Sequence, residues 1–380
     1  MKRTLRNMAL LLVLCLLLSA CGQSGNPASS AAAPQAPPPA QGDNSAETVE
    51  IVDMGGRKVT LPAPDKLKRL YPTGSTGLIL LYTLAPDKMT AAPSSTGNAF
   101  SDGQKKFLVP EVHNLPSYGT LSGKGSLNLE EIKKADVQVI LSMATSTVTE
   151  SDISAADELQ EQLQIPVVLF GGEMDEFAEA YRLLGKMIGR EEDAEKIIAY
   201  CQDIVKTVEA VSAEIPEEER TALYYAEGAD GLATEPASSN RSIVFNKAGA
   251  RNIAEVEALS GFGQSAVSME QVLNWNPEVI IVQGGSEAYD IIKTDENWAS
   301  IDAVKNGRVY KMPDLPFSWA DRPPSVNRFI GLHWMANLLY PDLYDIDIVE
   351  VAQDYYKVMY HVDISREDME ALLRDAVPGI

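Results

Sequence analysis

The sequence predicts an α/β fold with two lobes, each built around a mainly parallel sheet and joined by one long α-helix. Three observations predict it. Short apolar strands alternate with amphipathic helices along most of the 380 residues. Two stretches that lie 140 residues apart share one residue pattern. A single long amphipathic stretch lies between them, so the chain is expected to consist of two similar halves and a rod.

The rod is predicted over residues 190–215. Gly189 ends the helix before it, acidic residues fill its first turn, and Pro216 stops it. About 24 residues at 1.5 Å each give a helix of roughly 35 Å. Its apolar residues recur in steps of three and four, which keeps them on one face: Ala194, Ile197, Ile198, Cys201, Ile204, Val205, Val208 and Val211.

The repeated stretches begin at Asn128 and Ser268, residues that can cap a helix. Each continues with an apolar residue, then with Glu130 or Glu270, and ends in a short apolar strand. A capping box and the helix dipole account for acids in these first turns. They do not explain a Glu at the second helical position in both copies, where the side chain points to solvent. Two matching carboxylates also suit a partner with two basic sites.

The N-terminus has the pattern of a secretory signal peptide over residues 1–20, with a basic start and a short apolar run. The run is too short to span a bilayer. It ends in Leu-Ser-Ala-Cys, which is similar to the lipobox of bacterial lipoproteins and implies lipid on Cys21. Residues 21–46 are rich in Ala, Pro, Ser and Gln and are expected to be a disordered tether.

Net charge and cysteine content limit the partners and the chemistry that the chain can have. The net charge is −22, and losing three basic residues with the signal makes it about −25, which argues against nucleic acid and against direct adhesion to anionic lipid. Cys15 leaves with the signal, and Cys201 remains alone on the apolar stripe of the rod. A single thiol there is most simply a small core residue.

The first lobe is predicted over residues 47–172. Two short strands around Gly-Gly open it, and a strand running into a Gly-rich turn and a helix follows, whose free N–H groups can hold an anion. Apolar β-branched runs mark strands and periodic runs mark helices. In order, the expected elements are a hairpin at 50–61, strand 67–71, helix 78–84, strand 89–92, strand 137–143, helix 153–163 and strand 167–170.

Residues 173–216 form a helical segment, a helix at 175–188 and then the rod, and residues 217–380 form the second lobe. The same criteria place its elements, and a loop at 313–324 carries Phe317, Trp319, Asp321 and Arg322. The expected elements are strand 221–225, helix 242–248, strand 279–282, helix 287–292, strand 308–312 and terminal helices at 325–339, 346–360 and 365–376.

No constellation for catalysis or metal binding is apparent. His113, His333 and His361 are far apart, without the spacing of a zinc ligand pair, and no Gly-x-Ser-x-Gly motif occurs. The chain is therefore predicted not to be an enzyme and to need no cofactor. An anchored extracellular hydrolase stays open as the alternative from another class.

The chain resembles the periplasmic binding proteins for iron complexes and cobalamin, the substrate-binding lipoproteins of ABC importers. The resemblance spans residues 49–373 and rests on motifs in one order: Val52-Asp53-Met54-Gly55-Gly56-Arg57, Asn128-Leu129-Glu130, Met187-Ile188-Gly189-Arg190, Ser268-Met269-Glu270-Gln271-Val272-Leu273 and Val304-Lys305-Asn306-Gly307-Arg308. It implies two Rossmann-like lobes with a ligand cleft between them. It also implies that Glu130 and Glu270 pair with arginines of the permease. One departure is Ala135-Asp136-Val137, where the family usually has Lys-Pro-Asp.

Cleft residues are expected on loops at the facing ends of the strands. Arginines there can bind anionic oxygens in bidentate fashion, and Trp319 can stack on a flat ligand. For each residue, an ordinary surface or packing role is an equal alternative. The candidates are Tyr71, Thr73, Ser75 and Asn98 in the first lobe, and Tyr225, Arg241, Trp319 and Arg322 in the second.

The prediction is an extracytoplasmic lipoprotein, anchored to the membrane through Cys21, that captures a chelated metal. A ferric siderophore is the first candidate. Cobalamin, haem or an oxyanion such as molybdate are the alternatives within the class. The implied partners are an ABC permease dimer and its ATPase subunits. Because one helix bridges the lobes, closure on the ligand is expected to be modest.

Overall fold

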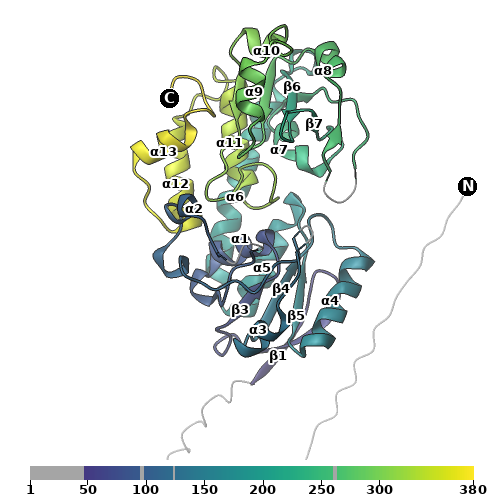
Figure 1. Cartoon of the computed structure of the whole chain (residues 1–380). Coiled ribbons are helices and arrows are strands. Elements are labelled where there is room, and N and C mark those ends of the chain that lie inside the picture. Colours follow the sequence, from purple (N-terminus) through teal and green to yellow (C-terminus); the bar gives the residue numbers. More distant parts are fainter. Residues whose placement is uncertain (1–46, 95–97, 123–124, 260–262) are drawn as a thin grey trace, which may run out of the picture. The chain divides into compact units, whose positions relative to one another are not determined.

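Each half of the chain builds one parallel β-sheet (Figure 1). The computed structural model describes residues 47–94, 98–122, 125–259 and 263–380, and the chain from Ser45 to Ile380 forms one unit. The predicted signal peptide, Cys21 and tether lie outside the described residues. The predicted division at residues 172 and 216 stays a prediction.

An antiparallel hairpin of β1 (Thr48–Val52) and β2 (Lys58–Pro62) precedes the first sheet, as the Gly-Gly turn predicts. Asp53 ties this hairpin to the sheet. Its Oδ1 accepts from the N–H of Arg57 at 2.9 Å, and its Oδ2 accepts from the N–H of Leu169 at 3.1 Å. The Arg57 guanidinium lies 3.0 Å from the same carboxylate, whose side chain is fully buried. One carboxylate thus satisfies the turn, a neighbouring strand and a buried cation.

The first sheet has the strand order β3-β4-β5, with every pair parallel. The strand expected at residues 89–92 is reduced to one bridge between Leu70 and Met89, because that segment soon turns into a loop. The elements of this half are β3 (Leu70–Pro72), α1 (Ser75–Leu84), α2 (Asp102–Lys105), α3 (Leu129–Lys134), β4 (Val139–Met143), α4 (Glu150–Leu163) and β5 (Val167–Phe170), with short 3₁₀ turns at Pro86–Lys88 and Pro110–Val112.

The second sheet has the order β11-β10-β6-β8, also parallel, beside a small antiparallel pair of β7 and β9. The elements are β6 (Ala222–Ala226), β7 (Ala233–Thr234), α7 (Ile243–Lys247), β8 (Arg251–Asn252), β9 (Ser265–Ala266), α8 (Met269–Trp275), β10 (Val279–Val282), α9 (Ala288–Thr294), α10 (Asp302–Lys305) and β11 (Val309–Lys311), with 3₁₀ turns at Glu217–Glu219 and Asn240–Ser242.

Both sheets are covered on both faces, as parallel sheets require. In β4, Leu141 belongs to a central core, while Ile140 faces a separate cluster with α3 and α4. In β10, Ile281 joins the same central core, while Ile280 faces a cluster with α8 and α9. Because side chains alternate along a strand, each sheet turns one face to its own outer helices and one face to a core that both share.

The rod is α6 (Glu191–Ala213), and it follows α5 (Phe177–Ile188) and the 3₁₀ turn Met174–Glu176. Gly189 ends α5 in the left-handed conformation, with a φ of 69°. A Cβ on Gly185 would lie 2.8 Å from the Cβ of Ala194, so glycine lets the two helices approach closely. Six of the eight residues of the predicted apolar stripe are buried, among them Cys201 as a free thiol, and Val205 and Val211 are partly buried. The rod packs against α5 and α11.

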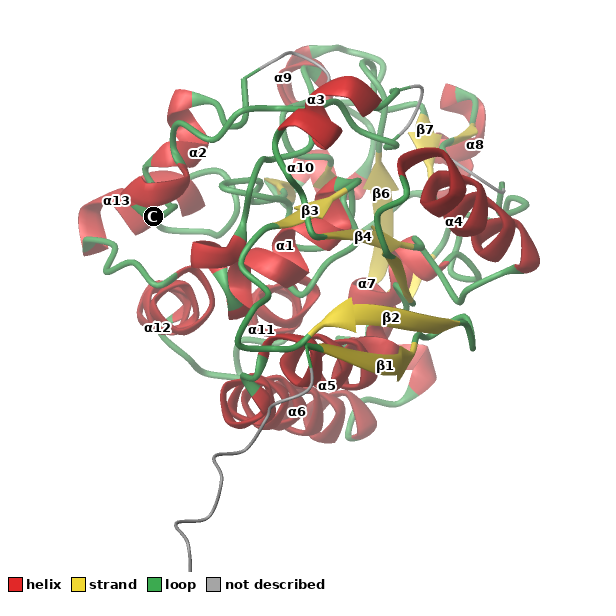
Figure 2. Ribbon diagram, turned by 90° about the horizontal axis from the view of Figure 1, so that it is seen from below, coloured by secondary structure: helices red, strands yellow, loops and turns green. Residues whose placement is uncertain are grey.

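The last helices return to the first half: α11 (Arg328–Leu339), α12 (Ile348–Tyr360) and α13 (Arg366–Leu373). The Tyr82 hydroxyl of α1 donates to the carbonyl of Tyr360 at 2.8 Å, and the His361 ring nitrogen lies 3.0 Å from the carbonyl of Thr83. Figure 2 shows α12 beside α6 and α1. Over the described residues, no helix is both long and apolar enough to cross a membrane.

Candidate functional site

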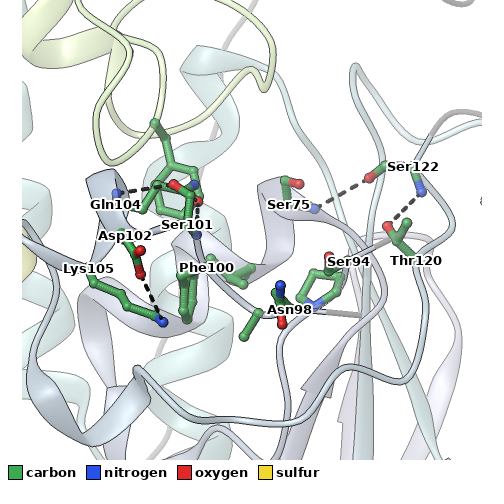
Figure 3. Close-up of a pocket in the computed structure, with 14 residues that line it drawn as sticks. Ser75, Ser94, Asn98, Phe100, Ser101, Asp102, Gln104, Lys105, Thr120 and Ser122 are labelled. Atoms are coloured by element: carbon green, nitrogen blue, oxygen red, sulfur yellow. Dashed lines mark hydrogen bonds and ion pairs between the residues drawn. The ribbon is translucent and has the colours of Figure 1, made fainter. Parts of the chain in front are cut away.

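A polar cavity of about 620 Å³ opens beside the N-terminus of α1 (Figure 3). Most of its described wall is hydroxyl, amide and backbone, and among the described lining residues only Phe317 comes from the second half of the chain. Cavities of this size hold small organic ligands in many proteins. The described lining residues are Ser75, Leu78, Pro93, Ser94, Asn98, Ala99, Phe100, Ser101, Asp102, Gln104, Lys105, Thr120, Ser122 and Phe317.

The start of α1 gives this cavity a favourable potential for anions. Gly74 is the N-cap, makes no side-chain capping bond, and no acidic residue follows in the first turn. The N–H of Ser75 meets the hydroxyl of Ser122 at 3.4 Å. A Cβ on Gly74 would approach that hydroxyl to 2.8 Å, so glycine keeps the contact possible. The positive end of a ten-residue helix dipole therefore faces the cavity.

The opposite wall is held by the short helix α2. Ser101 and Gln104 form a capping box, and the Gln104 amide donates to the carbonyl of Pro316 at 2.9 Å. Lys105, which is partly buried, lies 3.6 Å from the exposed Asp102 in an ion pair (Figure 3). This wall therefore adds donors and acceptors without net charge, and the Gln104 bond joins it to the loop of the second half.

A second group of polar side chains lies at the carboxyl end of β6, and we call it the arginine cluster. Its six charged members are Glu227, Glu235, Arg241, Asp321, Arg322 and Arg328. Arg322 Nε lies 2.5 Å from Glu227 Oε1, and Arg322 NH2 lies 3.0 Å from Glu235 Oε1. Arg241 NH1 lies 3.3 Å from Asp321 Oδ1. Arg241 and Arg322 thus form ion pairs with all three acids. Arg328 instead donates to the carbonyls of Ala320 and Asn240, with the charge of Asp321 nearby.

The arginine cluster adjoins the junction between the two halves. The Asn240 amide, next to Arg241 in the chain, donates to the carbonyl of Thr145 at 3.1 Å and to Glu173 Oε1 at 3.2 Å. Arg328 in turn donates to the carbonyl of Asn240 at 3.0 Å. The cluster therefore sits where the loops of both sheets meet.

The structure brings some predicted cleft residues together. Ser75 and Asn98 line one cavity, and Arg241 and Arg322 belong to one cluster. Burial raises the pKa of the Tyr225 hydroxyl well above its usual value, with Glu227 as the next cause. That hydroxyl has no hydrogen-bond partner among the described residues.

Three other predicted residues are buried in the packing. The Tyr71 hydroxyl donates to the carbonyl of Gly119 at 2.7 Å, and that of Thr73 donates to the carbonyl of Leu141 at 3.3 Å. Trp319 has no exposed surface, and its Nε1 donates to the Tyr356 hydroxyl at 3.0 Å. Its ring packs against Trp334 and Tyr356 and does not line the cavity beside α1.

Sequence reasoning missed the α2 side of the cavity and two acids of the arginine cluster, Glu227 and Glu235. The capping pair Ser101 and Gln104 indicates the start of α2 in the sequence. The sequence contains no signal that places α2 beside α1. Glu227 and Glu235 lie just after strands, a position that favours polar site residues. No cluster of His, Cys, Asp and Glu suited to a metal ion occurs in the part of the chain that the structure describes.

Glu130 and Glu270 lie in the first turns of α3 and α8, and both are exposed. Asn128 and Ser268 cap these helices through side-chain oxygens, as the repeated pattern predicts. In Figure 2, α3 and α8 lie toward the side of the molecule opposite α6. The two helices are therefore presented on a face that the rod leaves open.

Known proteins resemble this chain along most of its length. A family model described as "Periplasmic binding protein" matches residues 148–315. The molybdate-binding protein MolA of Haemophilus influenzae is 26% identical over 82% of this chain and 90% of its own length. The Fe(3+)-citrate-binding protein YfmC of Bacillus subtilis is 22% identical over 80% of this chain and 87% of its own. A solved ABC transporter solute-binding protein of Sulfurospirillum deleyianum is 30% identical, covers 86% of this chain and 99% of its own, and superposes with a TM-score of 0.77.

Proposed function

We propose that the cargo of this chain is a chelated metal, with a ferric siderophore as the first candidate. The premise of this proposal is that the chain belongs to the periplasmic binding proteins of ABC transporters. The chain is the substrate-binding component of such a transporter, and this family consists of extracytoplasmic, non-enzymatic solute carriers. One observation carries the proposal: a cavity of about 620 Å³, lined by hydroxyls and amides, at the positive end of α1.

The size of the cavity favours a chelate over a bare anion. A tetrahedral oxyanion has five heavy atoms, and at about 30 Å³ for each water-sized atom it fills roughly 150 Å³. This is about a quarter of the cavity volume of about 620 Å³. A ferric chelate surrounds the metal with organic oxygen ligands, so it fills the space and offers acceptors to Ser75, Ser122 and Gln104.

Molybdate is the second candidate, because the relative MolA is a molybdate-binding protein that matches 82% of this chain. This cargo requires the cavity walls to close further around the anion. Cobalamin and haem fit less well. The described lining contains no His, Tyr, Cys or Met to ligate an iron or cobalt, and Phe100 and Phe317 are buried.

Glu130 and Glu270 are proposed as the two contacts with the permease. They are exposed, occupy equivalent positions on α3 and α8, and belong to helices on one side of the molecule. Each carboxylate sits at a helix N-terminus, where it is accessible to an arginine of the partner. Anchoring through lipid on Cys21, with residues 21–46 as the tether, completes this proposal.

Calorimetric titration tests the cargo. The probes are ferric citrate, a ferric trihydroxamate, a ferric catecholate and sodium molybdate. We expect a ferric chelate to bind wild type, Ser75→Leu to weaken it at least tenfold by filling the cavity, and Ser151→Leu to leave it unchanged. Ser151 is the matched control, because it is an exposed serine in the first turn of α4.

Two outcomes would overturn parts of this proposal. Binding of molybdate with no response to any ferric chelate favours the second candidate. Equal affinity of wild type and Ser75→Leu for the bound probe shows that the cavity beside α1 is not the binding site. Mass spectrometry of protein purified under native conditions from its own host then identifies the cargo.

A further inference from the structure

We infer that the arginine cluster is an anion subsite that exchanges a carboxylate for a cargo anion: the anion takes over the Arg322 guanidinium, and the released Glu227 carboxyl takes up a proton. This inference rests on the proposed function, because it requires an anionic group on the cargo. It adds to that function the charge of the cargo and a dependence of binding on pH.

The cluster is layered, with cations toward solvent and acids behind them. The side chains of Arg241 and Arg322 are each 12% exposed, whereas those of Glu227, Glu235 and Asp321 are 0% exposed. An anion that reaches the junction between the halves therefore meets guanidinium edges before it meets any carboxylate. Guanidinium groups suit such a contact, because they bind planar oxyanions through two parallel donors.

Charge balance explains why a proton must accompany the anion. The described cluster has three arginines and three acids, so it is neutral when all six are ionised. An added anion leaves it with one uncompensated negative charge in a site shielded from water. Unpaired buried charges are strongly unfavourable, and such groups neutralise instead. Uptake of one proton by a carboxylate restores neutrality, with no bond other than O–H formed.

Glu227 is the acid placed to take that proton. The pKa of the Glu227 carboxyl is raised to about 7, with burial as the largest cause. Asp321 and Glu235 also raise this pKa, whereas Arg322 lowers it. Its Oε2 has no partner among the described residues, so it has room for a proton. When Arg322 turns to the anion, the largest effect that keeps Glu227 ionised is lost, and its proton affinity rises.

The other groups around Glu227 act in the same direction or lie farther away. Tyr224 and Tyr225 stay neutral, because burial raises the pKa of both hydroxyls. Arg328, on α11, is fully buried, and one of its terminal nitrogens, NH1, has no partner in the described structure. This unpaired donor is a second buried group that an anion or a water can satisfy.

Calorimetry in buffers of different ionisation enthalpy measures the proton. The probe is the ferric chelate or molybdate that binds wild type, at pH 7 and pH 8. We expect proton uptake that increases with pH and approaches one proton per ligand, and that disappears in Glu227→Gln. Glu192→Gln, an exposed acid on α6, is the control and keeps the uptake. Heats independent of the buffer, or the same uptake in Glu227→Gln, would overturn the inference.

A ligand-free titration separates this inference from the cargo. Carbon-13 NMR of labelled glutamate carboxyls should show one carboxyl titrating near pH 7 that is missing in Glu227→Gln. In Arg322→Met the same carboxyl should titrate at higher pH. If that variant does not fold, Arg322→Lys should give a smaller shift in the same direction. If no probe binds, the proposed cargo fails. The carboxyl exchange is refuted separately if no such resonance exists, or if the pH at which this carboxyl titrates is the same in wild type and in the Arg322 variants.

Discussion

Glu227→Gln should change how stability depends on pH, and the sign of the change follows from burial. Burial raises the pKa of this carboxyl from 4.5 to about 7 in the folded protein. Between those values the folded state holds a proton that the unfolded state has released. Stability therefore declines as pH rises from about 4.5 to 7, by about 1.4 kcal/mol per pH unit at most. The total over this window is on the order of 3 kcal/mol.

The difference between variant and wild type isolates this effect. Glutamine does not titrate, so Glu227→Gln should gain on the order of 3 kcal/mol relative to wild type between pH 4.5 and pH 8. This is a large share of a typical stability of about 5–15 kcal/mol. Urea unfolding followed by far-UV circular dichroism measures both proteins at each pH, and equal slopes against urea confirm that the same transition is compared.

The competing interpretation predicts the opposite sign. Arg322 Nε lies 2.5 Å from Glu227, and an ion pair that outweighed burial would depress the pKa of the carboxyl. The balance between burial and pairing differs at the two partners. For Arg322, burial lowers the pKa but the contact with Glu227 outweighs it and the pKa is raised. For Glu227, burial outweighs the contact with Arg322, and the pKa is raised as well. We favour burial for Glu227, because its side chain is fully buried and Arg322 keeps some contact with water. A variant that loses stability relative to wild type as pH rises would refute this reasoning.

Three further predictions concern other parts of the chain. Burial lowers the pKa of His333 from 6.5 to about 4, so stability should fall as pH drops from 6.5 to 4, and the difference between wild type and His333→Gln in urea unfolding should reveal on the order of 3 kcal/mol. Asp53→Ala should cost about 2–4 kcal/mol, because it leaves the N–H groups of Arg57 and Leu169 unsatisfied and leaves the Arg57 guanidinium with only its exposed partner Asp157. A loss below 1 kcal/mol in the same assay would contradict the anchoring role. Glu130→Ala with Glu270→Ala should abolish uptake in cells while leaving the calorimetric affinity for the cargo unchanged, and lost affinity would instead place these acids in ligand binding or folding.

Periodicity predicted most of the fold, because it reports which face of an element is buried. The stripe on α6 and the strands at Val167–Phe170 and Val279–Val282 are found where the pattern puts them. The segment at residues 89–92 differs, since an apolar run of four residues does not determine whether a neighbouring strand is within reach. Element ends were least predictable: the first terminal helix was expected from residue 325 and begins at Arg328.

The candidate site was harder to predict because its parts meet through long-range packing. Ser75 could be chosen, since a strand, a Gly-rich turn and a helix start mark a polar site locally. The contact of Gln104 with Pro316 joins residues 212 positions apart, and no local pattern encodes it. Trp319 looked available in a loop, but the sequence does not show that Trp334 and Tyr356 enclose its ring.

The core that both sheets share has a consequence for cooperativity. Residues such as Leu141 and Ile281 belong to one continuous apolar cluster, to which α12 adds Tyr355 and Tyr356. If the polypeptide were cut at the end of α6, neither fragment would retain enough of that cluster to fold alone. The N-terminal fragment would lose α12, which packs against α1, and the C-terminal fragment would lose the first sheet. The intact chain should accordingly melt in one calorimetric step, and its separated fragments should regain structure only when mixed.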